Sequence, residues 1–164
     1  MLVLALASAQ SPDYSKSVAT VLVFTTTDCP ISNRYAPEIK RLAKAFKARG
    51  VEFLLVYPVP TDTPAIIRKH QTEFAYDLSF TRDPKQALVK FSGVTVTPEV
   101  AVVNRRGKIV YRGRIDDRYV DFGKERLVVT THDLEDGLNA VVNGKPVRAA
   151  ETQAVGCYLP DLIK

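Results

Sequence analysis

The stretch V-A-T-V-L-V-F-T-T-T-D-C-P-I-S, residues 18–32, decides how this chain folds. It begins with a continuous run of apolar and β-branched residues, which is typical of a strand that is covered on both faces of a sheet. A threonine-rich turn follows, and apolar residues then recur at helical spacing from Ile31 until Gly50. The stretch therefore predicts a buried strand that leads into one amphipathic helix, which Pro37 should kink.

Cys29 lies in the turn, directly before this helix. The free N–H groups of a first helical turn and the positive end of the helix dipole stabilise a thiolate, so the pKa of the thiol should fall below its usual value of about 8.5. Asp28 should raise that pKa and Arg34 should lower it. The hydroxyl of Thr26 either bonds to the thiolate or a peroxide oxygen, or only packs. We expect Cys29 to be a nucleophile, and the alternative is a buried structural thiol.

The composition of the chain fits one globular domain, which we place at residues 11–164. It has 164 residues, of which 46% are hydrophobic and 25% are charged. The net charge of +5 comes from interspersed basic and acidic residues, so we expect no nucleic-acid partner. The two histidines are far apart in sequence and the two cysteines are not paired locally, so we expect no metal site. His70 follows Arg68 and Lys69 and is interpreted as a solvated side chain.

Residues 1–10, M-L-V-L-A-L-A-S-A-Q, are interpreted as part of a secretory signal with cleavage after Ala9. A packed N-terminal strand is the alternative. The apolar run is shorter than the roughly 20 residues of a membrane span, so we expect no membrane association after removal of the signal. Export to the periplasm or the extracellular space would permit a disulfide between Cys29 and Cys157, the two cysteines of the chain.

The rest of the chain alternates further strands and helices. Thr63 and Pro64 are typical of a helix N-cap and first helical position. The segment 116–130 is long and polar, which predicts a functional or capping insertion. The charged run from Arg112 to Arg118 either pins this insertion by salt bridges, which we favour, or lines a site. The other expected elements are a strand at 51–58, a strand at 78–81, a helix from Asp83 to about Phe91, a hairpin of 99–104 and 108–115, and a helix from Thr131 or His132 to Asn143.

Three motifs together resemble the thioredoxin-like superfamily, and within it the redoxin (alkyl hydroperoxide reductase/thiol-specific antioxidant) branch. They are T-T-T-D-C-P-I-S, the A-P-E that begins at Ala36, and V-T-V-T-P-E-V at 94–100. The resemblance implies an α/β, three-layer fold with a mixed central sheet flanked by helices, here with a C-terminal extension. It also implies that Thr97 and Pro98 form a cis peptide beside the reactive cysteine and help to hold an extended thiol substrate.

The same resemblance implies thiol-based redox chemistry without an organic cofactor. Cys29 takes the place of the nucleophile and Ser32 replaces the second cysteine of C-x-x-C, so Cys157 or an external thiol must resolve the intermediate. We expect Asp28, Ser32 and Arg34, with Thr97 and Pro98, around the substrate.

The expected partners are protein thiols or disulfides, or a small peroxide, together with an external thiol reductant. Thr26 matches the threonine of the peroxiredoxin pattern P-x-x-x-T-x-x-C, but Leu22 occupies its proline position. The alternative function is a non-catalytic binding or assembly module of the same fold, with a permanent bond between Cys29 and Cys157.

Overall fold

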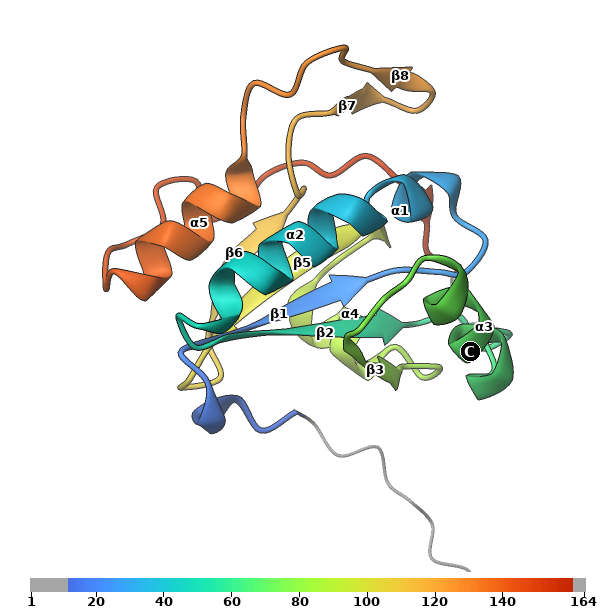
Figure 1. Cartoon of the computed structure of the whole chain (residues 1–164), viewed down its shortest axis with the longest axis horizontal. Helices are drawn as coiled ribbons and strands as arrows, with labels where there is room; N and C mark the ends of the chain where they lie inside the picture. Colours follow the sequence, from blue (N-terminus) through green and yellow to red (C-terminus); the bar gives the residue numbers. More distant parts are fainter. Residues whose placement is uncertain (1–11, 161–164) are drawn as a thin grey trace, which may run out of the picture.

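The protein, described here from a computed structural model for residues 12–160, is built on a five-stranded mixed sheet (Figure 1). The predicted signal segment 1–10 lies outside the described residues. Strands β1, β2 and β3 are parallel, and β5 and β6 are antiparallel to their neighbours. The strands lie in the order β3 (Ser79–Arg82), β2 (Val51–Tyr57), β1 (Ala19–Phe24), β5 (Glu99–Asn104) and β6 (Ile109–Gly113).

The central strand β1 is buried along its whole length. It pairs with β2 on one side and with β5 on the other, so that Val21 lies opposite both Phe53 and Val102. A strand in this position has no face open to water, which explains why its sequence shows no alternation of polar and apolar residues. The predicted buried strand is confirmed.

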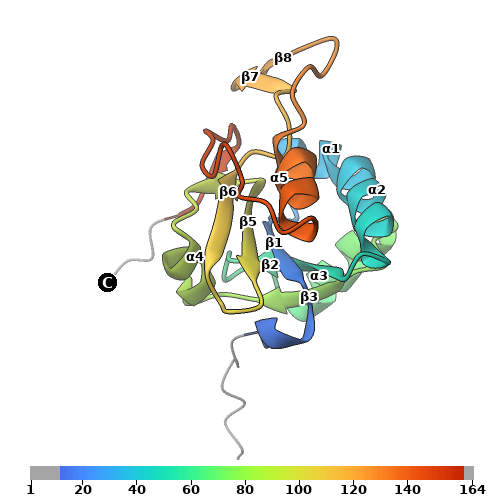
Figure 2. The ribbon, with the colours of Figure 1, turned by 90° about the vertical axis from the view of Figure 1, so that its left-hand side faces the viewer.

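Helices cover both faces of the sheet, which confirms the predicted three-layer α/β arrangement. The helices α2 and α5 lie over one face and α4 lies over the other (Figure 2). Leu42 of α2, Ile67 of α3 and Leu138 of α5 belong to the larger hydrophobic core, and Val89 of α4 belongs to the smaller one. The helical segments are η1 (Tyr14–Lys16), α1 (Pro30–Arg34), α2 (Ala36–Lys47), α3 (Pro64–Glu73), α4 (Ala87–Ser92) and α5 (Asp133–Val142).

Tyr35 separates α1 from α2, so the predicted single, kinked helix is wrong. Pro37 has no N–H to donate to the carbonyl of Asn33, and a proline ring crowds the carbonyl four residues before it. The chain therefore closes α1 with the amide of Tyr35, which donates to the carbonyl of Ser32 at 3.1 Å. The helix then restarts with Pro37 in its first turn, where a missing N–H costs little.

The two predicted helix starts have different outcomes. The Thr63 cap is confirmed, because its side chain accepts a hydrogen bond from the amide of Ile66 at 3.3 Å. The helix that was expected to begin at Asp83 instead begins at Ala87. Gln86 has a left-handed backbone (φ 53°), and Asp83 reaches forward to cap the helix by accepting from the amide of Ala87 at 2.8 Å.

The predicted insertion contains a hairpin of β7 (Tyr119–Asp121) and β8 (Lys124–Glu125) that projects away from the sheet (Figures 1 and 2). We call residues 117–131 the arm. Asp117 holds its base by accepting hydrogen bonds from the amides of Thr130 and Thr131 at 2.8 and 3.0 Å. The charged run also forms the salt bridges that the sequence favoured, since Asp117 pairs with Arg126 of the arm at 3.3 Å and Arg114 pairs with Asp133 at 2.7 Å.

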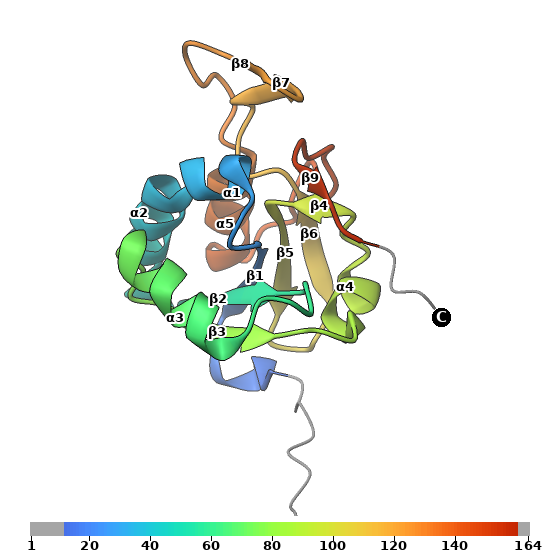
Figure 3. The same cartoon turned by 90° about the vertical axis from the view of Figure 1, so that its right-hand side faces the viewer.

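Two short strands form a separate antiparallel ladder (Figure 3). They are β4 (Val96–Thr97) and β9 (Cys157–Tyr158), with Thr97 opposite Cys157. The ladder brings the C-terminal extension beside the loop that precedes β5. Within residues 12–160, each helix is too short or too polar to cross a membrane.

Replacement of Leu138 tests the assignment of α5 to the core. Its side chain is 0% exposed, so we expect Leu138→Ala to lower the free energy of unfolding by about 2–5 kcal/mol, measured by urea denaturation. Leu127→Ala is the matched control, because Leu127 in the arm is fully exposed. It should change the free energy of unfolding by less than about 0.5 kcal/mol. Equal effects of the two substitutions would contradict the assignment.

Candidate active site

Cys29 occupies the N-cap position of α1, as the sequence predicted. The strand β1 delivers the chain to the edge of the core, and Pro30 starts the helix. The carbonyl of Cys29 accepts the first helical hydrogen bond, from the amide of Asn33 at 3.0 Å. Because α1 has only five residues, the stabilisation of a thiolate here depends on direct hydrogen bonds rather than on a long helix dipole.

The sulfur of Cys29 is surrounded by hydrogen-bonding groups although the residue is only 1% exposed. As a thiol it donates to the carbonyl of Thr97 at 3.1 Å. Burial raises the pKa of Cys29, but hydrogen bonds from the side chains and amides of Cys157 and Ser32 outweigh it, so the pKa is lowered. The site thus favours the thiolate form of Cys29.

Cys157 lies next to Cys29 through the β4–β9 ladder. Burial, hydrogen bonding to Cys29 and the negative charges of Cys29 and Asp28 raise the pKa of Cys157 to about 12. Both cysteines are free thiols. The two thiols of the reduced protein therefore differ: the pKa of Cys29 is lowered and the pKa of Cys157 is raised.

Gly156 permits this close approach of β9 to β4. A Cβ atom at this position would overlap the carbonyl oxygen of Thr97. The following residues are tied down as well, since the amide of Leu159 donates to Thr95 at 3.1 Å and the side chain of Gln86 donates to the carbonyl of Pro160 at 2.9 Å. The C-terminal extension is thus fitted to the site and carries Cys157 with it.

Three more of the predicted residues, Thr97, Pro98 and Ser32, lie beside Cys29. The Thr97–Pro98 peptide is cis, as the resemblance implied. Ser32 is 1% exposed, its hydroxyl has no hydrogen-bond partner among residues 12–160, and Ser32 is one of the groups that lower the pKa of Cys29. Ser32 is a local neighbour, three residues after Cys29, whereas the contact of Thr97 depends on how segments 68 residues apart meet.

The other three predicted residues have different positions. Arg34 pairs with Glu125 of the arm at 3.4 Å, and the groups that lower the pKa of Cys29 most are hydrogen-bond donors. Asp28 is exposed, and its charge raises the pKa of Cys157. Thr26 is buried, and in the described part of the chain its hydroxyl makes no hydrogen bond to Cys29.

His70 is a residue of this region that the sequence analysis interpreted wrongly. It is only 4% exposed, where a solvated side chain was expected. Its Nδ1 lies 3.0 Å from the hydroxyl of Tyr57, and its Nε2 lies 2.8 Å from Oδ1 of Asn33. The signal that could have found it is helical spacing, because His70 falls three residues after Ile67 and four before Phe74 and so shares their apolar face.

A second polar cluster lies away from Cys29. Ligand atoms of Glu38, His132 and Glu135 lie within 4.8 Å of one another. Arg41 pairs with both carboxylates, so a cation of the protein already neutralises them. This cluster is an ion-pair network between α2 and α5.

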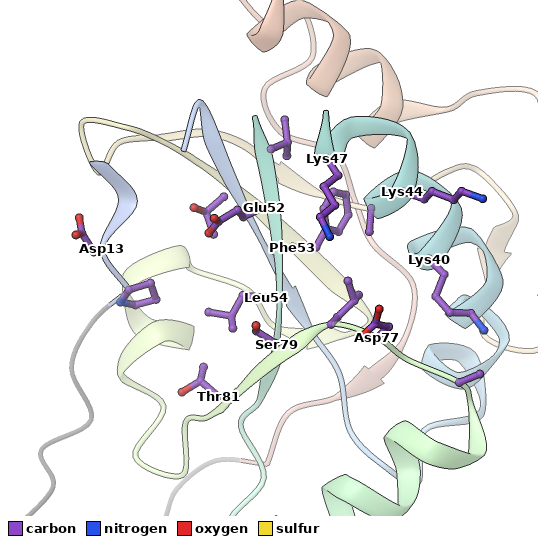
Figure 4. Close-up of a pocket in the computed structure, with 16 residues that line it drawn as sticks. Asp13, Lys40, Lys44, Lys47, Glu52, Phe53, Leu54, Asp77, Ser79 and Thr81 are labelled. Atoms are coloured by element: carbon purple, nitrogen blue, oxygen red, sulfur yellow. The ribbon is translucent and has the colours of Figure 1, made fainter. Parts of the chain in front are cut away.

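A cavity of about 740 Å³ lies between α2 and the strands β2 and β3 (Figure 4). Lys40, Lys44 and Lys47 of α2 lie along it, opposite residues of β2 and β3. Its lining includes neither Cys29 nor Cys157. The cavity is therefore separate from the thiol pair.

The structure is similar to several solved structures. An uncharacterized conserved protein from Geobacillus kaustophilus has 27% identity and a TM-score of 0.81, over 93% of this chain and 82% of that chain. A hypothetical protein from Sinorhizobium meliloti has 23% identity and a TM-score of 0.75, over 88% and 80%. A secreted disulfide oxidoreductase from Mycobacterium tuberculosis has 16% identity and a TM-score of 0.52, over 80% and 84%, and this likeness shows the fold alone.

None of the curated proteins compared with the chain matches it. The model of one protein family, Redoxin, does match, over residues 5–122. The matched range contains Cys29 and the cis peptide before Pro98, and it ends before Cys157. This match covers most of the length of the chain, and the fold is thioredoxin-like. The chain therefore belongs to the Redoxin family.

Proposed function

We propose that the protein is a thiol–disulfide oxidoreductase in which Cys29 is the nucleophile and Cys157 is the resolving thiol. One observation carries the proposal. Two thiols from distant parts of the chain meet, and the pKa of one is lowered while the pKa of the other is raised. A thiolate is the form that attacks a disulfide, and a protonated neighbour leaves only one sulfur ready to do so.

In the first step, the Cys29 thiolate attacks one sulfur of a disulfide in a partner protein. The S–S bond of the partner breaks, its second sulfur leaves as a thiolate, and a mixed disulfide with Cys29 forms. Thr97 and Pro98 adjoin the attacking sulfur, and we assign them to the binding of the partner's extended chain. Ser32 and the exposed Asp28 and Arg34 complete the surroundings of the partner.

In the second step, Cys157 gives its proton to the partner thiolate released in the first step or to water, and the Cys157 thiolate attacks the sulfur of Cys29. The partner leaves as its second thiolate, and a Cys29–Cys157 disulfide remains, so two electrons have passed from the two cysteines to the partner. The charge of Cys29 raises the pKa of Cys157 in the reduced protein. That charge is absent from a mixed disulfide, so Cys157 ionises more easily when it is needed. An external thiol reductant returns the two electrons.

Two alternatives receive less support. Attack on a peroxide would give sulfenic acid at Cys29 and release water or an alcohol, after which Cys157 would condense with it and release water. The hydroxyl of Thr26, which should assist that step, makes no bond to Cys29 in the described residues. A non-catalytic module with a permanent bond between the cysteines needs no lowered pKa at Cys29.

We also propose that the protein works in an exported, oxidising compartment, periplasmic or extracellular. Support comes from the apolar start of the sequence, with its small residues before Gln10, and from a thiol pair that is placed to form a disulfide. The proposed partners are protein thiols and disulfides. A reporter enzyme that is active only after export, fused after residue 10, tests the location, and an expressed fusion without reporter activity would contradict it.

The order of the two steps is testable by trapping. We expect Cys157→Ser to accumulate a mixed disulfide between Cys29 and a disulfide-containing peptide, because a hydroxyl cannot resolve it. The wild type should instead release the peptide thiol and form a Cys29–Cys157 disulfide that mild reductant reopens. Peptide mapping under non-reducing conditions measures both, and Cys29→Ser is the blank. Turnover of hydrogen peroxide but not of the peptide would refute disulfide exchange.

The fit of β9 is tested at Gly156. Gly156→Ala should slow the formation of the Cys29–Cys157 disulfide at least tenfold, because the new Cβ overlaps the carbonyl of Thr97 and pushes β9 away. Gly137→Ala in α5 is the matched control, since a Cβ there meets its nearest atom at 3.6 Å, an ordinary contact. Rates are followed by quenching with an alkylating reagent. An unchanged rate in Gly156→Ala would show that β9 does not deliver Cys157.

The hydrogen bond from Ser32 is tested by titration of Cys29. In a Cys157→Ser background, Ser32→Ala should raise the pKa of Cys29, because it removes one of the donors that lower it. The ultraviolet absorbance of the thiolate follows the titration. Ser92→Ala is the control, since Ser92 is a buried serine of α4 that donates to the carbonyl of Leu88. Equal titration curves for Ser32→Ala and the parent protein would remove Ser32 from the site.

A further inference from the structure

We propose that His70 is a positioning residue for Cys29, and that its neutral imidazole holds the segment 27–33 in the conformation that stabilises the thiolate. The inference deepens the proposed function, because it concerns the same nucleophile. His70 itself is one helix away, in α3, and acts through Asn33.

A chain of hydrogen bonds links His70 to both ends of the segment. The side-chain amide of Asn33 contacts Nε2 of His70 at 2.8 Å and donates to the carbonyl of Thr27 at 3.2 Å. The backbone amide of the same Asn33 donates to the carbonyl of Cys29 at 3.0 Å. Asn33 thus closes the turn around Cys29, and His70 holds Asn33.

A second anchor comes from the same side of the molecule. Asp62, in the loop between β2 and α3, accepts a hydrogen bond from the hydroxyl of Thr27 at 2.6 Å. Asp62 lies two residues before α3 and His70 lies within it. Asp62 bonds to Thr27 before Cys29, and His70 bonds to Asn33 after it, so this one region holds both ends of the segment. The position of the Cys29 sulfur between Ser32, Thr97 and Cys157 depends on these two hydrogen bonds.

The contacts define which form of His70 is bound. The carbonyl of Thr27 can only accept, so the NH₂ group of Asn33 must face it and Oδ1 must face His70. Oδ1 can only accept, so the proton of the imidazole is on Nε2. The other nitrogen, Nδ1, then accepts from the hydroxyl of Tyr57 at 3.0 Å. When His70 is neutral, every donor in this series of hydrogen bonds faces an acceptor.

A second proton on His70 would break this arrangement. Both ring nitrogens would donate, and within residues 12–160 the hydroxyl of Tyr57 has no other acceptor than Nδ1. The ring lies among Tyr57, Phe74 and Tyr76, where a positive charge loses its hydration. Burial lowers the pKa of His70 more than the nearby charges of Asp62 and Glu73 raise it.

The sign of the pH dependence follows. The folded protein protonates His70 less readily than the unfolded chain does, because burial lowers the pKa of His70 from 6.5. The contribution of His70 to the stability of the folded arrangement is therefore complete above about pH 6.5 and is lost as the pH falls below that value. Acid should release the segment 27–33 before the rest of the fold.

Two substitutions separate positioning from simple packing. In a Cys157→Ser background, His70→Phe fills the space without hydrogen bonds, and His70→Gln keeps a donor for Asn33 but does not titrate. We expect the thiolate fraction of Cys29 at neutral pH, measured by ultraviolet absorbance, to fall about tenfold in His70→Phe and to stay within about twofold in His70→Gln. A residue that only stabilises the fold would change the unfolding temperature and leave the titration of Cys29 unchanged, and that result would overturn the proposal.

If His70→Phe does not fold, Asn33→Leu tests the same link from the other end, with the same expected loss of thiolate. A further measurement tests the pH dependence. Hydrogen exchange of the amides at 29–33, corrected for intrinsic exchange, is compared between the parent protein, which is Cys157→Ser, and the same protein with His70→Gln. The parent should exchange faster below pH 6.5 and His70→Gln should not, and identical behaviour would overturn the proposal. All these measurements use Cys29 without its partner thiol, so they remain valid even if the Cys29–Cys157 exchange reaction is absent.

Discussion

The structure depends on the solvation of one buried sulfur by protein groups. A thiolate that is removed from water is unfavourable unless hydrogen bonds replace the lost hydration. Here the donors come from Ser32 in α1 and Cys157 in β9. Ser32 lies three residues after Cys29, whereas Cys157 reaches the sulfur only because β9 pairs with β4, whose Thr97 contacts Cys29. The order of the strands and the fit of the C-terminal extension are therefore requirements of the chemistry as well as of packing.

The sequence predicted the features that depend on neighbouring residues. The continuous apolar run of β1, the helix start at Cys29 and the Thr63 cap are local patterns, and all three are present. The break at Tyr35 was also local, but helical periodicity hid it, since Pro37 is tolerated in a first turn and forbidden in an interior. The family resemblance supplied the cis peptide before Pro98, which a dipeptide does not reveal.

The rest of the candidate site could not be predicted, because it depends on contacts between distant residues. The burial of His70 follows from the docking of α3 beside Asn33, and the flanking Arg68 and Lys69 gave the opposite impression. The pairing of Thr97 with Cys157 joins segments that are 60 residues apart, and it needs the absence of a side chain at Gly156. No periodicity in the sequence encodes that register.

The place of Cys157 in the chain also has a consequence for biosynthesis. Every strand of the main sheet, and the last helix α5, precedes Cys157 in the sequence. Chains are made from the N-terminus, so Cys29 is made before most of the sheet and Cys157 only after all of it. A newly made chain therefore carries only one of the two thiols until the main sheet and α5 have been made, and the proposed Cys29–Cys157 disulfide cannot form before then.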